Sequence, residues 1–476
     1  MSRVTYQEAE TYISELPKFT KKNTLEHTQK FLSFLGNPQN GKKVIHVAGT
    51  NGKGSVCVYL DAMLRAQRKH TGLFTSPHLI RMNERIRMDG EPVSDETFTR
   101  LFLRTQQSVR RMEAEGLPHP SFFEFLFGMA MAGFEEAGVE YVILETGLGG
   151  RLDATNSISG PLTCILTSIG LDHTEILGNT LEEIAAEKAG ILKPHVPVIF
   201  ADTQQESSRV IEERAGELGC PCKKIGKSAY EILKIQDGTL AFSPSNAYYG
   251  DTTWKLQNTA MYQPENAMLA MEAMRMIFGE QGDVSGWREA LSQVKWEGRM
   301  EEILPDFYVD GAHNVSAVRM FVQSIQRDRR EKVVLFSAVR EKNYEEMIRI
   351  LCQEKSVSEY VITLIEDKRA AQTEELKQIF QKYTDKPVVV KEELHQALTY
   401  LFSRKAGKGG VLPRISLSDR NDKSDNRGGR VMLDYEKELK NFKPSLEVEE
   451  IEDAVYQEDL SDMTDLLKQV MDQKTK

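Results

Sequence analysis

Short apolar runs alternate with amphipathic stretches through the first three hundred residues of the chain. Three runs have the length and composition of buried strands: Val44–Ala48, Tyr141–Leu144 and Cys164–Thr167. Three longer stretches predict helices: Ser55–Gln67, Phe122–Phe134 (apolar nearly all round) and Pro264–Phe278. Strands that alternate with helices in this way are typical of an α/β fold with a parallel sheet.

A second alternation of the same kind begins near Met300. It predicts strands over 306–309, 333–336, 360–364 and 388–390, with helices over 315–326 and around Leu376. We therefore expect an N-terminal domain over 1–297, with a parallel sheet and a P-loop type of nucleotide site. A smaller Rossmann-like α/β domain is expected over 298–404.

The pattern changes after Arg404. Residues 405–430 are rich in Gly, Ser, Asp, Asn, Lys and Arg, which predicts an exposed, disordered segment. Residues 431–476 are acidic with spaced apolar positions, which predicts one or two amphipathic helices. Together they form a charged linker and tail over 405–476, whose helices either pack locally or dock a partner.

Composition narrows the classes of function. The chain has 476 residues, 28% of them charged, and a formal net charge of −10, which argues against a nucleic-acid partner. No apolar run approaches the ~20 residues needed to cross a bilayer, and none resembles a signal peptide. The five scattered cysteines fit a reducing compartment. We expect a cytoplasmic protein with no membrane partner.

A glycine-rich loop, Gly49–Ser55, lies directly between the first predicted strand and its helix. Glycines let a backbone approach phosphate closely, and a helix N-terminus directs free N–H groups at an anion. Lys53 is placed to neutralise β- and γ-phosphates, and the Ser55 hydroxyl to bind Mg²⁺. Only two residues separate Gly49 from Gly52, so the spacing is not that of the standard Walker A motif. The loop nevertheless predicts nucleotide binding.

Two further strand ends carry candidate metal ligands. Glu145 follows a buried strand and precedes the segment Thr146–Asn156, which holds several glycines, Arg151 and Asp153. A carboxylate there is costly unless it meets a cation. His173 follows the next strand. Its spacing alone does not decide between a metal ligand and a structural histidine. Lys188 lies near the C-terminal end of a predicted helix. From the pattern alone, its positive charge interacts favourably with the helix dipole there.

The first strand–loop–helix junction of the second domain is also polar. Asp310 could hold ribose hydroxyls or a cation, His313 could reach a phosphate, and Arg299 lies just before them. These groups would face a crevice between the domains, where small-molecule sites are common.

These segments together resemble the folylpolyglutamate synthase family, often bifunctional with dihydrofolate synthase and related to the Mur ligases. The motifs are Gly-Thr-Asn-Gly-Lys-Gly-Ser at 49–55, Glu-Thr-Gly-Leu-Gly-Gly-Arg-Leu-Asp-Ala-Thr-Asn at 145–156, Leu-Asp-His-Thr at 171–174, Glu-Lys-Ala-Gly-Ile at 187–191 and Asp-Gly-Ala-His-Asn at 310–314. The resemblance covers about residues 1–400. Residues 149–156 and 74–79 favour the folate branch over the Mur branch.

The resemblance implies an ATP-dependent ligase that joins L-glutamate to a folate, either tetrahydrofolate or dihydropteroate, through an acyl phosphate. It implies ATP as co-substrate, two Mg²⁺ ions and a carbamylated Lys188, and we expect a monomer. The implied metal ligands are Ser55, Glu145, His173 and Lys188. The implied catalytic residues are Lys53, Lys188 and His313. The implied ATP contacts are Thr50, Asn51, Gly52, Lys53, Gly54, Ser55, Asn266, Arg299 and Asp310. The implied folate contacts are Phe123, Arg151, Leu152, Asp153, Ala154, Ser76 and His78.

Two departures from the family pattern stand out. The usual last strand motif is replaced by Gly409–Leu412 and a charged segment that follows it. The sequence therefore does not decide whether the last strand is present. Glu341-Lys342-Asn343 replaces a commoner Asp-Lys-Asp. The alternatives are a Mur-type ligase acting on a UDP-linked cell-wall precursor and a non-catalytic nucleotide-binding scaffold.

Overall fold

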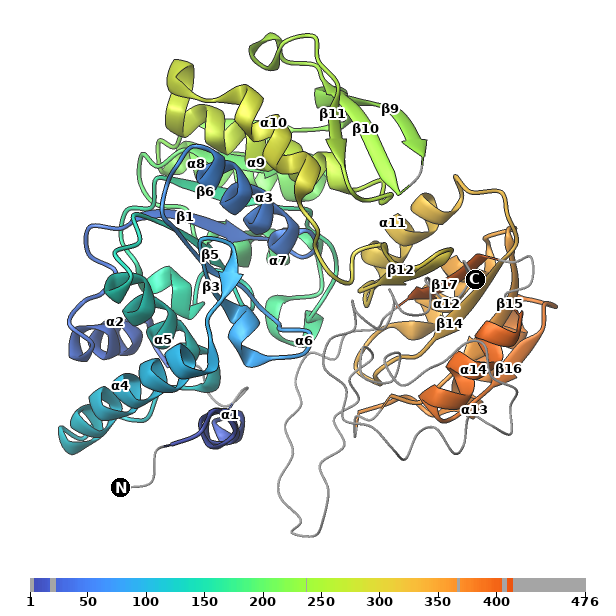
Figure 1. Cartoon of the computed structure of the whole chain (residues 1–476), viewed down its shortest axis with the longest axis horizontal. Helices are drawn as coiled ribbons and strands as arrows, with labels where there is room; N and C mark the ends of the chain where they lie inside the picture. Colours follow the sequence, from blue (N-terminus) through green and yellow to red (C-terminus); the bar gives the residue numbers. More distant parts are fainter. Residues whose placement is uncertain (1–3, 18–22, 237, 366–368, 405–408, 414–476) are drawn as a thin grey trace, which may run out of the picture.

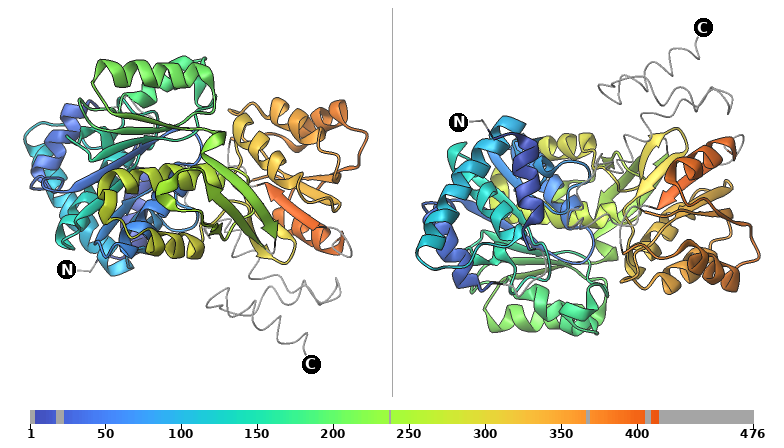
Figure 2. Two further views of the ribbon diagram at one scale, coloured as in Figure 1. Left: turned by 90° about the horizontal axis from the view of Figure 1, so that it is seen from above. Right: turned by 90° about the horizontal axis from the view of Figure 1, so that it is seen from below.

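The computed structural model describes residues 4–17, 23–236, 238–365, 369–404 and 409–413. A large α/β unit and a smaller one lie side by side, and the chain passes between them near residue 298 (Figures 1 and 2). Within the described residues, no helix has the length and apolar character that crossing a membrane requires.

The larger unit is built on a sheet with strand order β4-β3-β2-β5-β1-β6-β7-β8. Its strands are β1 (Lys43–Ala48), β2 (Thr71–Phe74), β3 (Ile86–Met88), β4 (Glu91–Pro92), β5 (Tyr141–Glu145), β6 (Thr163–Leu166), β7 (Val198–Ala201) and β8 (Cys222–Ile225). The strands from β2 to β8 in this order pair in parallel, whereas β3 and β4 form an antiparallel edge. The parallel sheet expected from the sequence is confirmed.

Helices cover both faces of this sheet, which explains why its strands are apolar runs without alternation. Val44 of β1 belongs to one hydrophobic core and its neighbour Ile45 to the core on the opposite face. The Val44 side carries α1 (Tyr6–Glu15), α2 (Leu25–Phe34), α4 (Asp95–Ala114) and α5 (Phe122–Glu136). The Ile45 side carries α3 (Lys53–Ala66), α9 (Gln263–Phe278) and α10 (Val284–Gln293). A third core, beside β6 and β7, is covered by α6 (Thr174–Leu177), α7 (Leu181–Ala189) and α8 (Gln205–Glu217).

An antiparallel sheet interrupts the expected parallel pattern. It consists of β9 (Tyr230–Gln236), β10 (Thr239–Pro244) and β11 (Trp254–Leu256) in the order β11-β10-β9. Three side chains of this sheet are fully buried in the core that also holds α3 and α9, namely Leu240, Phe242 and Trp254. The large apolar residues Leu240 and Phe242, two positions apart in β10, are the sequence signal that could have predicted this sheet.

The smaller unit has the strand order β12-β13-β17-β14-β15-β16. Its strands are β12 (Glu301–Leu304), β13 (Phe307–Asp310), β14 (Lys332–Phe336), β15 (Val357–Ile362), β16 (Val388–Val390) and β17 (Gly409–Pro413). One face is covered by α11 (Val315–Ile325), α12 (Tyr344–Cys352) and α13 (Thr373–Tyr383), the other by α14 (Leu394–Arg404). All strands except β12 pair in parallel, as expected for a Rossmann-like unit.

The prediction that residues 405–430 are disordered is wrong for Gly409–Pro413. This segment is β17, which pairs in parallel with β13 on one side and β14 on the other. Leu412 aligns with Val309, and Gly410 aligns with both Phe307 and Val333. Hydrogen bonding to two neighbouring strands stabilises a glycine-rich segment whose composition alone predicts a loop. The last strand of the domain, left open above, is therefore present. The predicted acidic tail helices, after residue 430, lie outside the described residues.

Candidate active site

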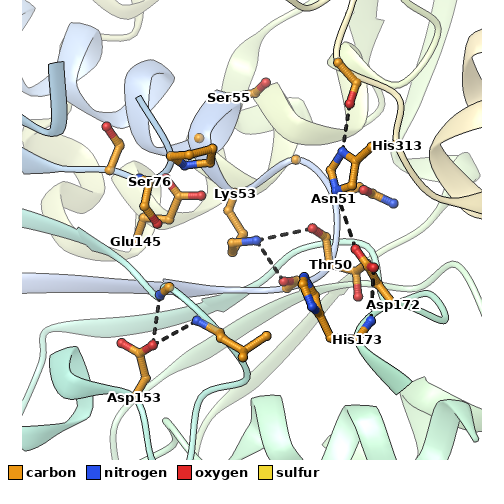
Figure 3. Close-up of a pocket in the computed structure, with 18 of the residues that line it drawn as sticks. Thr50, Asn51, Lys53, Ser55, Ser76, Glu145, Asp153, Asp172, His173 and His313 are labelled. Atoms are coloured by element: carbon orange, nitrogen blue, oxygen red, sulfur yellow. Dashed lines mark hydrogen bonds and ion pairs between the residues drawn. The ribbon is translucent and has the colours of Figure 1, made fainter. Parts of the chain in front are cut away.

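A cleft of about 510 Å³ opens where the carboxyl ends of the central strands face the smaller unit (Figure 3). Its walls come from the loops that follow β1, β2, β5 and β6, the N-terminal part of α5, the start of α9, the linker 296–299 and the loop after β13. Open α/β sheets bind ligands at this edge because loops from neighbouring strands converge there. All five motifs of the sequence therefore contribute residues to one cleft.

The glycine loop has a conformation that side chains would prevent. Gly52, the residue before α3, has a φ of +92°. A Cβ atom on Gly52 would lie 2.3 Å from Oδ1 of Asn266, and one on Gly49 would lie 1.8 Å from Oγ1 of Thr167. Lys53 Nζ donates to the carbonyls of Gly49 and Thr50, at 3.1 and 3.2 Å. The loop thus curls around its own lysine at the N-terminus of a helix, as an anion site requires.

Replacing Gly52 by alanine is expected to raise the KM for ATP about tenfold or more, because the new methyl group collides with Asn266 and strains φ. Gly36 is a matched control, since it has the same φ of +92° but no atom within 4 Å of the position that a Cβ would take. Gly36→Ala should cost stability without a change in KM. Equal KM values for the two variants would show that close packing at Gly52 does not shape the nucleotide site.

Glu145 is the buried carboxylate at the floor of the cleft, with 3% of its surface exposed. Burial raises its pKa, while Lys53, the N–H of Ser76, Arg299 and Arg85 act in the opposite direction. The Ser76 N–H donates to Glu145 Oε2 at 3.0 Å, so the Ser76 hydroxyl belongs to the same corner (Figure 3). A carboxylate in such a place is stabilised by a cation.

The donor set around Glu145 fits a magnesium ion that also binds phosphate. Among the described residues no group of three or more His, Cys, Asp or Glu side chains could hold a metal alone. Mg²⁺ is commonly held by one or two carboxylates together with substrate phosphates. The cleft offers the Glu145 carboxylate beside the phosphate loop, with Ser55 and Ser76 as further oxygen donors. Ser55 lines the cleft, but its buried hydroxyl accepts a hydrogen bond from Gln263 Nε2 at 3.2 Å.

Lys188 lies inside the molecule, although its place near the end of α7 is typical of a solvent-exposed charge. Only 4% of its surface is exposed, and Nζ donates to the Gly49 carbonyl at 2.8 Å. Thr180 and Glu183 form a capping box at the start of α7. Lys188 is thus held against the phosphate loop by a well-defined helix.

His173 lines the same cleft and has a left-handed backbone conformation, with φ of +49°, at the start of α6. Burial lowers its pKa, which favours the neutral imidazole that binds metals. The preceding Asp172 is a central acceptor. It receives hydrogen bonds from Lys342 Nζ at 2.5 Å and Asn314 Nδ2 at 3.0 Å. Although burial opposes it, His313 and Lys342 hold the Asp172 pKa well below its usual range.

His313 joins the two units rather than extending freely into the cleft. Its Nδ1 lies 2.8 Å from the Gly311 carbonyl, and its Nε2 lies 3.5 Å from Asp172 Oδ2 (Figure 3). An imidazolium would satisfy both contacts by donating to each. Nearby, Asn51 of the phosphate loop donates to Ser316 Oγ at 2.8 Å. The phosphate loop therefore contacts the N-terminus of α11 directly.

Asp310 is buried among donors. It accepts from Tyr262 OH at 2.7 Å, from Met300 N at 2.9 Å and from Ala312 N at 2.8 Å. Burial raises its pKa, although Arg299 and these donors oppose the change. Asp310 lines the cleft and also anchors the linker, and Arg299 donates to the Gly298 carbonyl beside it at 3.0 Å.

The expected folate contacts are brought together in part. Phe123, Leu152, Asp153, Ala154, Ser76 and His78 line the cleft. Arg151 does not. It points outward, its side chain is 59% exposed, and it pairs with Glu187 at 2.7 Å. The structure therefore does not bring Arg151 together with the other expected folate contacts at the cleft.

Asp153 has a structural task that sequence reasoning missed. Its Oδ2 accepts from the N–H groups of Gly147 and Leu148, and its Oδ1 accepts from the N–H and hydroxyl of Thr155. These four bonds fix the loop that follows Glu145. Asp153 therefore shapes the wall of the cleft.

Known proteins share this architecture. Residues 298–412 match the family model described as Mur ligase, glutamate ligase domain. The chain is 37% identical over 358 residues to the dihydrofolate synthase/folylpolyglutamate synthase of Bacillus subtilis, with 73% of this chain and 82% of that protein covered. The chain belongs to the dihydrofolate synthase/folylpolyglutamate synthase family.

Solved structures of this family have the same fold. Folylpolyglutamate synthase from Mycobacterium tuberculosis, complexed with ADP, superposes with a TM-score of 0.76 at 27% identity, covering 86% of this chain and 94% of that one. E. coli FolC in complex with DHPP and ADP superposes with a TM-score of 0.72 at 25% identity, covering 86% and 94%. The family fold thus extends over nearly all the described residues.

Some cleft residues of this family member were not predicted from the sequence. Arg85 and Trp296 line the cleft, and Trp296 packs its ring 3.2 Å from where a Cβ on Gly54 would lie. Glu124, on the first turn of α5, accepts from Asn23 Nδ2 and the Ser121 N–H, both at 2.7 Å. The signal for Glu124 was present, because Ser121 and Glu124 have the spacing of a capping box.

Glu124 predicts a pH dependence of stability. Burial acts to raise its pKa, but hydrogen bonds from His27, Ser121 and Asn23 outweigh it and lower the pKa from 4.5 to about 2. A lowered folded-state pKa stabilises the fold above pH 4.5, and this contribution is lost as the pH falls toward 2. We expect Glu124→Gln to reduce the unfolding free energy at pH 6 by on the order of 3 kcal/mol.

The difference in unfolding free energy between wild type and Glu124→Gln should shrink as the pH falls from 4.5 to 3. Denaturant unfolding at each pH measures this difference. Glu135→Gln, an exposed change on the same helix, is the control. A difference between wild type and Glu124→Gln that stays constant down to pH 3 would contradict the lowered pKa.

Proposed function

We propose that the chain is an ATP-dependent ligase that forms an amide between a folate carboxylate and L-glutamate, releasing ADP and phosphate. The observation that carries this function is the shared cleft. A phosphate loop with Lys53, the buried Glu145 and the aromatic Phe123 all line it. Phosphate, metal and a flat ring system could therefore bind side by side. Relatives named for folate ligases support the same reaction.

ATP is the proposed co-substrate. Thr50, Asn51, Gly52, Lys53, Gly54 and Ser55 would bind the triphosphate, mainly through backbone N–H groups and the Lys53 ammonium. Asn266, Arg299 and Asp310 would contact the nucleoside end. Relatives crystallised with ADP support this assignment. The negative charge of the chain is no obstacle, because the loop creates a local positive field.

Two Mg²⁺ ions are proposed at the cleft floor. Glu145 with the Ser55 hydroxyl would hold one, and His173 with a carbamylated Lys188 the other. The Ser76 hydroxyl beside Glu145 is a further oxygen donor. Bound Mg²⁺ would neutralise triphosphate charge and align the γ-phosphate. Carbamylation joins the neutral Lys188 amine to CO₂ and releases a proton, which turns a cation into a carboxylate-like ligand.

The chemistry needs positioning and charge neutralisation more than acid–base groups. A carboxylate oxygen of the acceptor attacks the γ-phosphorus of ATP, and ADP leaves with the electrons of the broken P–O bond. The amine of glutamate then attacks the acyl phosphate carbon, loses a proton, and phosphate leaves. Lys53 would neutralise charge on the transferred group. His313, held near Asp172, would contact anions from the second domain.

Phe123 would stack on the pterin ring, with Leu152, Asp153, Ala154, Ser76 and His78 around it. Arg151 is not retained in this set, because its side chain is turned away and paired with Glu187. We further propose that residues 1–297 bind ATP and folate, that the following domain contributes the glutamate side, and that the enzyme acts as a monomer in the cytoplasm.

Omission experiments test the function. We expect ADP release by the purified protein with MgATP only when both a reduced folate and L-glutamate are present. ADP release that is unchanged when both are omitted would contradict the ligase. Turnover with UDP-linked cell-wall precursors, but not with folates, would instead indicate a Mur-type ligase.

A further inference from the structure

Arg85 is a nearly buried cation in the wall of the cleft. It ends the 3-10 helix η1 (Met82–Arg85), immediately before β3, and only 5% of its surface is exposed. Its guanidinium lines the cleft, although sequence reasoning gave it no role. A buried charge is stable only where other groups compensate it, so the residues around Arg85 define its role.

The contacts of Arg85 fix its orientation. Nε donates to His78 Nδ1 at 2.7 Å, and the guanidinium carbon lies 5.2 Å from the centre of the Phe122 ring. These two contacts come from the loop after β2 and from the start of α5. Arg85 is therefore held in the wall of the cleft by contacts with two different segments.

Lys53, Arg299 and Arg85 all line the cleft, and they differ in where they lie. Lys53 is held by the carbonyls of the phosphate loop, and Arg299 by the carbonyl of Gly298 in the interdomain linker. Arg85 lies with His78 and Phe122, the residue before Phe123. Of these three cations, Arg85 is the one that lies beside the aromatic residues at the start of α5.

We propose that Arg85 binds the acceptor carboxylate that is not phosphorylated, and so selects glutamylated folates over acceptors without glutamate. This inference rests on the proposed ligase function. A glutamylated acceptor carries two carboxylates on its last residue. One attacks ATP, and the other stays anionic in a partly buried cleft and needs a counter-charge. A guanidinium binds such a carboxylate through two parallel hydrogen bonds.

The reacting carboxylate is a poorer match for Arg85. Two hydrogen bonds from one guanidinium would hold both of its oxygens and reduce their nucleophilicity toward phosphorus. A dihydropteroate acceptor has only the reacting carboxylate, so binding of that acceptor should not depend on Arg85. Selectivity between the two acceptors follows directly from this difference.

The test compares acceptors as well as variants. For Arg85→Gln we expect the KM for a monoglutamylated reduced folate to rise about 10- to 100-fold, since one charged partner is lost. The KM values for ATP and dihydropteroate should stay within about twofold. An acceptor whose free α-carboxylate is replaced by an amide should bind wild type as weakly as it binds Arg85→Gln. Arg81→Gln is the matched control, because Arg81 directly precedes the same 3-10 helix but pairs with Asp95 on the surface.

Other outcomes would overturn the proposal. Equal losses with both acceptors would assign Arg85 to the reacting carboxylate or, through His78, to the ring pocket that both acceptors share. A raised KM for ATP would assign it to the nucleotide. Unchanged kinetics would leave Arg85 a structural residue. If Arg85→Gln does not fold, Arg85→Lys can replace it, and the amide acceptor can be tested with wild type alone. Wild-type enzyme that binds the amide acceptor as tightly as the carboxylate acceptor would refute the carboxylate contact. Wild-type enzyme inactive with every acceptor would instead refute the ligase function itself.

Discussion

Lys53→Ala is expected to lower kcat by roughly 10³-fold, because the ammonium group that neutralises the transferred phosphoryl is lost. The fold should survive, since Lys53 is only half-buried and its side chain donates to two carbonyls of its own loop. Measurement combines steady-state ADP release with thermal unfolding. The effect should appear mainly in kcat, because backbone N–H groups of the loop still hold the triphosphate.

Lys43→Ala is the matched control for Lys53. Lys43 lies at the start of β1, on the same strand–loop–helix unit, and makes an exposed ion pair with Glu140. Such pairs contribute about 0–1 kcal/mol, so neither activity nor stability should change much. Substantial ligase turnover by Lys53→Ala would refute the phosphate role of the loop lysine.

Lys188→Met is expected to reduce turnover about as severely as Lys53→Ala if the carbamate is the working group. Methionine keeps most of the buried volume, so the helix and the phosphate loop should stay in place. Millimolar acetate or formate should restore part of the activity by supplying a carboxylate in the vacated space, and Lys188→Ala should be rescued better because it leaves more room.

A second readout separates the carbamate from a simple ammonium. Wild type incubated with ¹³C-bicarbonate should show a carbamate signal in the carbon NMR spectrum, and Lys188→Met should not. If that signal is absent from wild type and short acids rescue neither variant, Lys188 acts as a cation that braces Gly49 instead.

The general architecture could be predicted because both faces of the main sheet are covered. Buried strands such as β1 and β5 are then continuous apolar runs, and the helix α3 after β1 has a glycine at its start. β17 could not be predicted in this way. Its stability comes from pairing with β13 and β14, which lie much earlier in the chain, and not from its own composition.

The site was predictable to the extent that its residues follow strand ends. Glu145, His173 and Asp310 come from different strands, and all line the cleft. Side-chain direction was not predictable. Arg151 turns outward to Glu187, whereas Lys188 turns inward to Gly49, and neither direction follows from the sequence pattern. Arg85 was missed because only tertiary packing brings it next to Phe122.

The most direct test of the account is the mass of the product formed from a reduced folate. Purified protein is incubated with MgATP, L-glutamate and tetrahydrofolate or dihydropteroate in separate reactions, and the folates are analysed by mass spectrometry. We predict a product heavier by one added glutamate residue, in step with the ADP released. Folates that remain unchanged while ATP is consumed would contradict the assignment as a folate:glutamate ligase.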